Sequence, residues 1–424
     1  MSETVNITVT QDVESVQVGV TPIREFVTVK VYPNGQGLPI GGTTGQVLTK
    51  QSGTDLDAIW EDPAGSSGDW IQQAPPADGN IYAFRNGAPV KLKPETEWLI
   101  FATHVTDVST WVVNGGTPIL DSNGNVTFDT PETVISVQIY DGLTAASVVD
   151  ASIFPALQYL ELNSTPITTP PILTGLTFLN SLYLSATNIT TPPVLTGLTA
   201  LAELLLDATN ITTPPVLTGL SSLQYLNLSY TDIATPPVLT GLHSLKTILL
   251  SHTPITTPPV FTGLHSLENI LLSHTNITTP PVMTGMGSLY QLDLSHTDIA
   301  TPPVLTGMSQ LNILYLGGTP ITTPPVLTGA PNLSELGLDG TNITTPPAVT
   351  GLYYLQYVYL NGTAITSVTA INNFFNQLDT AASVLPASDG YVDISGGTNA
   401  VPTAPSLAAR SHLIDALYWT IVTN

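Results

Sequence analysis

The 424-residue sequence contains no cysteine, which excludes a disulfide framework and any thiolate metal cluster. Basic residues are also scarce, because eight Lys and Arg stand against 31 Asp and Glu, giving a formal net charge of -23. Six of the eight precede residue 94, which leaves Lys246 and Arg410 for the rest of the chain. Binding to nucleic acid requires many basic contacts with phosphate, so nucleic acid is not expected as a partner.

Long apolar runs are missing as well. No stretch of about eighteen consecutive apolar residues occurs, so we expect no membrane insertion. The opening "MSETVNITVTQDVESV" has neither a basic nor an apolar segment, so no secretory signal is indicated and synthesis in a cytoplasm is expected. Since only 9% of residues are charged, Thr, Ser, Asn and Gly must supply most of the polar surface, as in many extracellular and virion β-proteins.

The sequence is rich in one 22-residue repeat, written "LNSLYLSATNITTPPVLTGLTA" from Leu179 to Ala200. Ten copies begin at Leu157, Leu179, Leu201, Leu223, Leu245, Leu267, Leu289, Leu311, Leu333 and Leu355. The L-x-x-L-x-L spacing of its first six positions resembles leucine-rich repeats, with Thr at position nine where most members have Asn. The resemblance implies a solenoid of stacked coils.

Each position of the repeat has a predicted role. The leucines at positions one, four and six, the isoleucine at position eleven and the apolar pair after the prolines are predicted to fill a continuous core. Residues around position four form a short strand that pairs in parallel with the next coil. The threonine at position nine bonds turn backbone through its hydroxyl. Paired prolines exclude a convex helix, which predicts extended chain with a short 3₁₀ turn, and the glycine at position nineteen is expected at positive φ.

The pattern changes on both sides of the repeats. Residues 96–152 alternate in strand-like runs and predict a small β-domain that caps a solenoid at 153–366. Residues 367–424 predict an α/β cap of two helices and two strands. The first helix is expected to bury Val368, Ile371, Phe374, Phe375 and Leu378. The segment "DISGGTNAVPTAPSLAARSHLI" resembles caps of leucine-rich repeat proteins from Bacteroidetes bacteria and their phages.

Two short segments before residue 95 resemble modules of phage tail fibres and other virion fibres. They are "GGTTGQVLTKQSGTDLDAIWEDP" (41–63) and "APPADGNIYAFRNGAPVKL" (74–92), the second departing from its module at Ala83-Phe84-Arg85 and Pro89. The resemblance implies strand-turn modules at 41–95 that trimerise, with Trp60 or Trp70 at an axis. The alternative is that "GGTTG" is only a flexible linker. Residues 1–40 are expected to be an attachment segment, in which residues 2–33 alternate as strands do and pair with another chain or the virion.

The predicted fold class is therefore mainly β, a leucine-rich repeat solenoid with N-terminal β attachment modules and a small α/β C-terminal cap. Its candidate binding surface is the row of outward strand residues, where tyrosines could stack on sugars and carboxylates could bond hydroxyls. These residues are Tyr159, Glu161, Tyr183, Asp207, Tyr225, Asn227, Asp293, Tyr315, Glu335, Asp339, Tyr357 and Tyr359. An ordinary exposed β-surface rich in Tyr and Thr would look the same.

Position eight of three consecutive coils is histidine: His252, His274 and His296, with Tyr230 next in line. These side chains are expected to stack about 5 Å apart on the concave face, and all four are candidate ligand-binding residues. Three close imidazoles can share a metal ion, but no acidic second shell is in register, so neither a metal nor a cofactor is predicted. A polar ladder copied by repeat duplication is the simpler explanation.

Catalytic motifs are not found in the sequence: there is no G-x-S-x-G, Walker loop, H-E-x-x-H or dinucleotide fingerprint. Glu161 and Asp207 lie two coils apart, roughly 10 Å, too far for a retaining glycosidase pair. We therefore expect no enzymatic activity.

The sequence favours a structural fibre protein of a phage virion, made in the host cytoplasm. It is expected to be a homotrimer that attaches to other virion proteins through its N-terminus and binds a host surface glycan or protein through the repeats. Tail fibre and head fibre remain alternatives. A bacterial surface leucine-rich repeat protein that binds host protein or glycan is a third possibility.

Overall fold

The computed structural model describes residues 100–384 and 389–424 and the backbone of seven strands before residue 93. The chain divides into two compact units, Met1–Glu95 and Thr96–Asn424. Trp70 and the "GGTTG" stretch lie outside the described residues. The predicted trimer axis at Trp60 or Trp70 therefore stays a prediction.

The described strands of the first unit form one three-stranded sheet and two hairpins. The antiparallel sheet has the order β1 (Thr4–Val9), β2 (Val16–Thr21) and β3 (Glu25–Val29). These strands were expected to pair with another chain or the virion, whereas here they pair with one another, with β1 and β3 at the two edges.

The two hairpins fall in the segments that resemble fibre modules. In the first, β4 (Val47–Lys50) pairs with β5 (Ala58–Glu61), which places Trp60 opposite Leu48. In the second, β6 (Ile81–Arg85) pairs with β7 (Ala88–Leu92). Both segments therefore have the strand-turn form that the resemblance implied.

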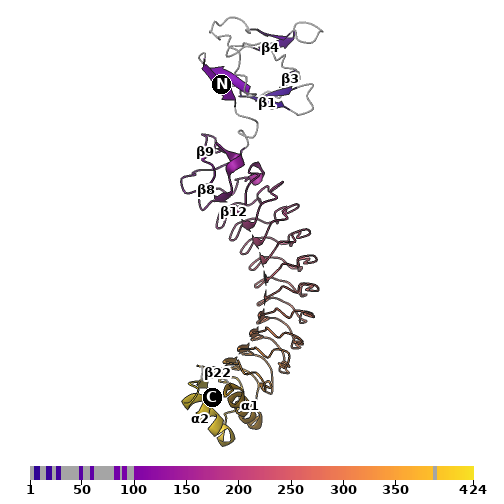
Figure 1. Ribbon diagram of the computed structural model, residues 1–424, viewed down its shortest axis with the longest axis vertical. Coiled ribbons are helices and arrows are strands. Elements are labelled where there is room, and N and C mark those ends of the chain that lie inside the picture. The colour runs from indigo at the N-terminus through magenta and orange to yellow at the C-terminus, as the bar shows by residue number, and fades with distance from the viewer. Residues whose placement is uncertain are drawn as a thin grey trace. The chain divides into compact units, whose positions relative to one another are not determined.

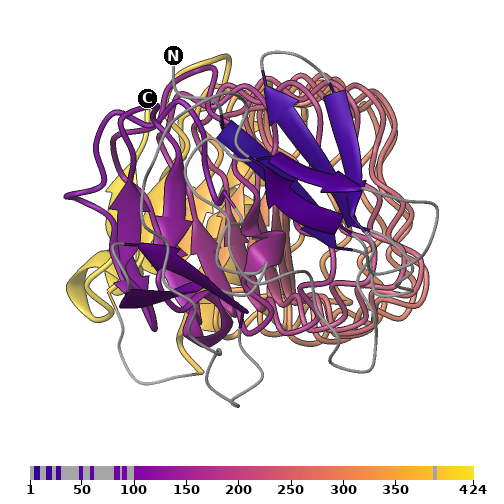
Figure 2. The same cartoon turned by 90° about the horizontal axis from the view of Figure 1, so that it is seen from above.

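The second unit is a curved rod of stacked coils with short strands along its inner side (Figure 1). Each coil contributes one three-residue strand, and neighbouring strands pair in parallel with a 22-residue offset, as Leu160 pairs with Leu182. Seen from above, the coils overlie one another (Figure 2). The coil strands are β12 (Tyr159–Glu161), β13 (Ser181–Tyr183), β14 (Glu203–Leu205), β15 (Tyr225–Asn227), β16 (Thr247–Leu249), β17 (Asn269–Leu271), β18 (Gln291–Asp293), β19 (Ile313–Tyr315), β20 (Glu335–Gly337) and β21 (Tyr357–Tyr359).

The core runs the length of the rod, as the repeat pattern predicts. Leu157, Leu160 and Leu162 are fully buried, and so are their equivalents in the following coils apart from Leu355, which is 2% exposed. The apolar pair after the prolines was predicted to point inward, and this is wrong for its first member. Val194 is 76% exposed whereas Leu195 is buried. Successive residues of extended chain point to opposite sides, so only one of the two can reach the core.

Threonine at position nine is buried in every coil and bonds to its own coil. The Thr165 hydroxyl donates to the Leu162 carbonyl oxygen at 2.6 Å, and the same bond recurs in all ten coils through Thr363. The predicted hydroxyl-to-backbone bond is therefore confirmed.

The convex side has no helix among residues 154–366, all of which are described, in agreement with the paired prolines. Single turns replace it, such as the bond from Leu176 N–H to the Leu173 carbonyl oxygen at 3.3 Å. The glycine at position nineteen has the expected positive φ in eight coils, for example +82° at Gly175. Gly329 differs, because a Cβ there would stand 2.1 Å from the Leu305 carbonyl oxygen. Close backbone approach, and not positive φ, requires that glycine.

The N-terminal end of the rod is closed by a small β-region. Strand β11 (Ser136–Gln138) pairs in parallel with β12, and β8 (Val112–Asn114) pairs with β11 antiparallel. A hairpin of β9 (Pro118–Leu120) and β10 (Val126–Phe128) lies beside them. Four aromatic rings pack beneath: Phe101, Trp111, Phe128 and Phe154. Two 3₁₀ turns complete the region, η2 (Pro131–Thr133) and η3 (Ala151–Ile153).

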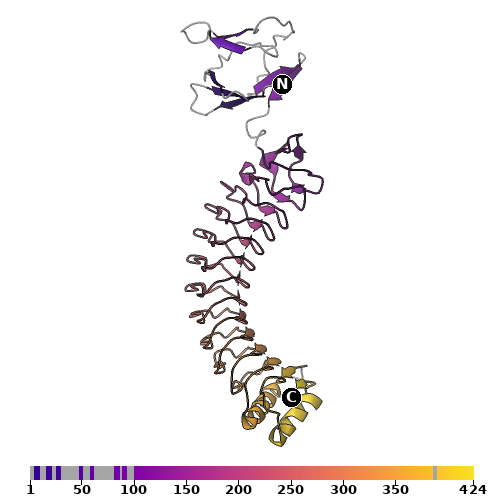
Figure 3. The same cartoon turned by 180° about the vertical axis from the view of Figure 1, so that it is seen from behind.

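The C-terminal end carries the predicted helix, strand, helix and strand (Figure 3). These are α1 (Val368–Ala382), β22 (Tyr391–Asp393), α2 (Leu407–Asp415) and β23 (Thr420–Val422), with η4 (Ala404–Ser406) before α2. Strands β22 and β23 continue the parallel sheet beyond β21. The predicted buried face of α1 is correct except at Val368, which is exposed. Val368 directly follows the N-cap Ser367, so it precedes the turns that pack on the rod.

Candidate binding surface of the solenoid

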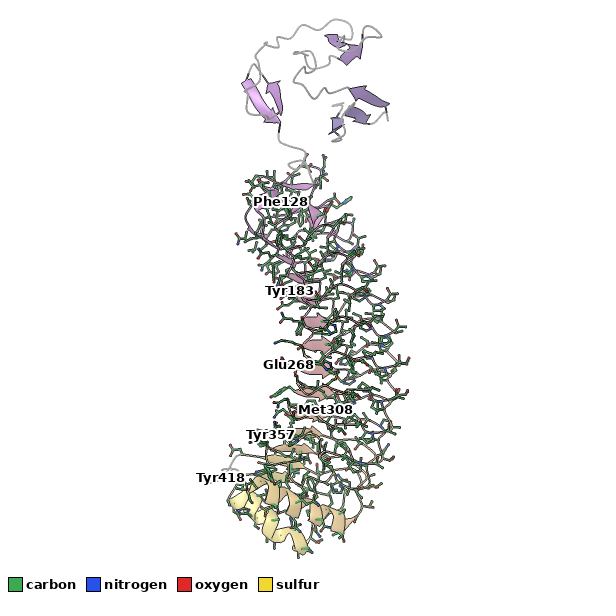
Figure 4. All side chains as sticks on the ribbon, turned by 45° about the vertical axis from the view of Figure 1, so that its right-hand side comes forward. Phe128, Tyr183, Glu268, Met308, Tyr357 and Tyr418 are labelled. Carbon is green, nitrogen blue, oxygen red and sulfur yellow. The ribbon has the colours of Figure 1, made fainter. Side chains whose placement is uncertain are left out.

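The inner face of the rod is built from the first and third residue of each three-residue strand. In most strands the middle residue is buried and the flanking two are half-buried, so the flanking pair faces outward. Tyr183 and Tyr357 lie on this side (Figure 4). The structure places ten of the predicted residues there: Tyr159, Glu161, Tyr183, Tyr225, Asn227, Asp293, Tyr315, Glu335, Tyr357 and Tyr359.

Two predicted members of that row are not strand residues. Asp207 and Asp339 lie two residues beyond the ends of β14 and β20, because the strands last only three residues before the chain turns. Asp207 Oδ1 accepts a hydrogen bond from the Ser185 hydroxyl at 2.6 Å. These carboxylates therefore belong to the turn at the strand ends and not to the strand face.

One group of tyrosines and carboxylates lies near the N-terminal end of the inner face. The Tyr159 hydroxyl donates to Glu161 at 2.6 Å, and the Tyr183 hydroxyl donates to Glu203 on the next coil. The rings of Tyr159 and Tyr183 meet edge to face, with centroids 5.2 Å apart. We call Tyr159, Glu161, Tyr183 and Glu203 the N-terminal tyrosine cluster. Glu203 was missed from the sequence, although it occupies the same third position of the repeat as Tyr159.

A second group lies near the C-terminal end. The Tyr315 hydroxyl donates to Glu335 at 2.6 Å, repeating the coil-to-coil geometry of Tyr183 and Glu203. The rings of Tyr359 and Tyr391 lie 5.7 Å apart. We call Tyr315, Glu335, Tyr359 and Tyr391 the C-terminal tyrosine cluster. Tyr391 belongs to β22 of the cap and was not predicted.

Of the strands between the clusters, β15, β16 and β17 carry no charge on their flanking residues, whereas β18 presents Asp293. Strands β16 and β17 present Thr247, Leu249, Asn269 and Leu271, and the Asn269 side-chain amide donates to the Thr247 hydroxyl at 3.1 Å. The inner face therefore offers two aromatic, acidic areas separated by the uncharged strands β15 to β17, and Asp293 adjoins the C-terminal area because it pairs with Tyr315. A ligand that contacts both areas must be several coils long.

The hydroxyls of both clusters stay protonated at physiological pH. Burial raises the pKa of Tyr183 to about 12, and the hydrogen bond to Glu203 adds to the effect. Burial and a carboxylate partner likewise raise the pKa of Tyr159 and of Tyr315. The hydroxyl groups of Tyr159, Tyr183 and Tyr315 therefore each donate a hydrogen bond to a carboxylate. The remaining lone pairs of that carboxylate are free to accept from donors on a ligand.

The raised pKa of Tyr183 gives a direct test of this pairing. Because the folded pKa lies above the ordinary value of 10.0, the pairing stabilises the fold fully below pH 10 and loses this effect as pH rises toward 12. We expect the phenolate absorbance that Tyr183→Phe removes to appear only near pH 12. In Glu203→Gln it should appear at lower pH. Ionisation of Tyr183 at the same pH in both proteins would contradict the pairing.

Position eight forms a second row, at the turn that follows each strand. His252, His274 and His296 stack with ring centroids 4.2 and 4.3 Å apart, and Tyr230 stacks on His252 at 4.2 Å. The predicted stacking is confirmed, but the row lies three residues beyond the strands and not on the strand face. We call these four residues the ring stack.

The geometry of the ring stack does not suit a shared metal ion. Its rings are parallel within 13°, so their in-plane nitrogen lone pairs point alongside one another and not toward one point. Within the described part of the chain, no group of three or more His, Asp or Glu side chains is placed to hold a metal ion.

Comparison with solved structures identifies the architecture. An internalin from Listeria monocytogenes matches with a TM-score of 0.51 and 20% identity, over 68% of this chain and 89% of that one. The chain has the leucine-rich repeat fold. A leucine-rich repeat protein of Leptospira interrogans also matches, with a TM-score of 0.48 and 20% identity, over 64% of this chain and 79% of that one. No protein-family model and no curated protein matches the chain.

None of these comparisons matches the chain to an enzyme family. Among the described residues, none of the helices combines the length and the apolar character needed to cross a membrane.

Proposed function

We propose that this protein is a structural fibre protein of a phage virion that attaches to the host surface through the inner face of its leucine-rich repeat solenoid. The supporting observation is the pair of tyrosine clusters at the two ends of that face. Solenoids commonly bind partners on their concave side, where neighbouring repeats present equivalent positions in a row. The ligand is a host surface glycan or protein.

The chemistry of the clusters suits a carbohydrate. Tyrosine rings stack on the apolar faces of sugars, and a carboxylate such as Glu203 or Glu335 accepts hydrogen bonds from sugar hydroxyls. Each carboxylate is already oriented by a tyrosine of the neighbouring coil. The protein is proposed to bind without cleaving, because Glu161 and Glu203 lie on strands separated by β13, roughly 10 Å apart.

The N-terminal unit is the proposed attachment region. The hairpins β4 with β5 and β6 with β7 lie in segments similar to phage fibre modules. We propose that these modules assemble three chains and that the strands ahead of them bind other virion proteins. Three copies would also raise the avidity of weak contacts with the host. Tail and head are both compatible with this arrangement.

The virion assignment is tested by mass spectrometry and cryo-electron microscopy of purified phage particles. We expect the chain in the particles, in trimeric fibres whose distal part is the solenoid. Particles that lack the chain would overturn the assignment and favour a bacterial surface protein. The position of the fibres distinguishes tail from head.

The binding face is tested with Tyr183→Ala and Tyr315→Ala on a glycan array and on host cells. Each variant loses a ring and the donor that orients a carboxylate, so we expect about tenfold weaker binding. Tyr354→Ala is the matched control, because this tyrosine is exposed but lies outside the strands. Equal binding by all three variants and the native protein would place the site elsewhere.

A further inference from the structure

The ring stack occupies a backbone position that does not itself call for large side chains. Position eight has positive φ in all ten coils. Its occupants outside the stack are Ser164, Ala186, Ala208, Gly318, Gly340 and Gly362, all small. The left-handed region disfavours bulky residues, yet Tyr230 and the three histidines adopt it at φ between 53° and 57°. The turn alone therefore does not explain the four rings.

The rings form one continuous band with accessible ends. Tyr230 is 59% exposed and follows Ala208, whose methyl group leaves room beside the outer face of the tyrosine ring. At the other end, the His296 ring lies over Gly318, with Nδ1 within 2.5 Å of the point where a Cβ would stand. The band is therefore bounded by small residues on both sides.

A row of hydroxyls runs beside the band. Position seven in the same four coils is serine: Ser229, Ser251, Ser273 and Ser295. The hydroxyls of Ser251 and Ser273 are 3.0 Å apart, and the Ser295 hydroxyl donates to Asp293 at 2.6 Å. Ser229 and Ser273 are buried, whereas Ser251 and Ser295 are half-buried, so these two hydroxyls supply donors and acceptors beside the band.

The coils around the stack also hold most of the titratable positive charge of the second unit. Residues 223–310 contain five of the seven histidines of the sequence and one lysine, against four carboxylates. The charged and titratable groups are Asp232, His243, Lys246, His252, His265, Glu268, His274, Asp293, His296 and Asp298. With neutral imidazoles this stretch is negative, like the rest of the chain. With protonated imidazoles it becomes positive.

At the centre of the stack, protonation of His274 is opposed by burial and by the neighbouring rings. Burial lowers the pKa of His274, and the nearby His252 and His296 lower it further, while Asp293 acts in the opposite direction. The His274 imidazole therefore gains its charge only as pH falls below the ordinary value of 6.5. An anion bound along the edge would reduce the repulsion between protonated rings, so its binding and their protonation favour each other.

We propose that the ring stack is a second binding site, for an acidic polysaccharide, which fills as its imidazoles protonate. Carboxylate or sulfate groups accept hydrogen bonds from the imidazolium N–H groups of His252, His274 and His296. Sugar hydroxyls bond the half-buried Ser251 and Ser295, and a sugar ring stacks on the free face of Tyr230. The site rests on the proposed function, because its ligand is a host surface glycan, but it lies at the turns and not on the strand face.

The test uses the full chain with all three histidines replaced, His252→Gly, His274→Gly and His296→Gly. Glycine is native at the equivalent Gly318, Gly340 and Gly362, so the turn accommodates it. The probes are polygalacturonate, dextran sulfate and uncharged dextran, measured by calorimetry at about pH 5.5 and about pH 7.5. We expect the native protein to bind at least one polyanion about tenfold more tightly at the lower pH, and the triple variant to lose this gain.

A matched control separates the stack from general positive charge. His243→Thr with His265→Thr removes two imidazoles outside the stack, at the position that Thr199 holds in an earlier coil. This control should keep most of the gain at low pH. The proposal is overturned if the native protein shows no tighter binding at the lower pH, or if it binds uncharged dextran equally well. It is also overturned if the triple variant keeps the gain in affinity, or if the control loses as much of that gain as the triple variant. Failure of Tyr183→Ala to weaken binding at neutral pH would instead count against the inner face alone.

Discussion

Replacement of Leu226 by alanine should lower the free energy of unfolding of the solenoid by roughly 2–5 kcal/mol. Leu226 is fully buried in the middle of β15, where it pairs with Leu204 on one side and Ile248 on the other. Those neighbours are held at fixed spacing by the strand hydrogen bonds, so they cannot move in to fill the cavity. The removed side chain also weakens contacts with both adjacent coils, on which a repeat protein depends.

The measurement is urea unfolding of the full chain, with circular dichroism reporting the solenoid. Val238→Ala provides the matched control, because Val238 is an aliphatic residue of the same coil that is 70% exposed. We expect this control to change stability by less than about 0.5 kcal/mol. Equal destabilisation by the two variants would mean that Val238 and the equivalent valines of other coils, such as Val194, are covered in solution. The core would then extend beyond the leucines.

The difference in burial between Leu226 and Val238 also shows which buried positions can be predicted from the sequence. A buried position that recurs in ten copies is recognisable because its apolar character persists while its neighbours vary. The period therefore predicts the strands, the leucine core and the bond of Thr165 without knowledge of the fold in space. The same reasoning wrongly predicts that Val194 is buried, because an apolar residue recurs at this position too. Extended chain allows only one of two consecutive residues to face inward.

The candidate site was predictable in position but not in pairing. Tyr183 and Tyr315 could be assigned to the inner face from their place in the repeat. Their partners Glu203 and Glu335 lie 20 residues away, because position five of one coil meets position three of the next. The ring stack could be found from its 22-residue spacing. Its left-handed backbone has a sequence signal as well, since glycine takes the same position from Gly318 onward.

The cap depends on a single amide that the sequence did not identify. Asn399 is buried, and its side-chain Nδ2 donates to the carbonyl oxygens of Leu360 and Ile394 at 2.8 and 3.0 Å. Its Oδ1 accepts from the Ile365 N–H at 3.2 Å and lies 2.6 Å from the Thr363 hydroxyl, whose single proton it shares with the Leu360 carbonyl oxygen. One side chain therefore contacts Leu360, Thr363 and Ile365 of the last coil and Ile394 of the cap.

Asn399 replaces the threonine that the ten coils use. Ile394 corresponds to position six, so position nine of this eleventh turn is Gly397. A Cβ at Gly397 would stand 2.3 Å from the Thr363 carbonyl oxygen, which excludes threonine there. The amide of Asn399 reaches back instead to the Ile394 carbonyl oxygen, the group that a threonine hydroxyl would otherwise bond.

Asn399→Ala should therefore destabilise the cap by about 3 kcal/mol or more, because it leaves the Ile365 N–H and the Ile394 carbonyl oxygen buried without this partner, at about 1–3 kcal/mol each. Hydrogen exchange should report the loss first in β21 and β22, since coils contact only their neighbours. Asn373→Ala, an exposed position of α1, is the control and should change stability by less than about 0.5 kcal/mol. If both variants exchange alike, the apolar face of α1 holds the cap and the amide does not.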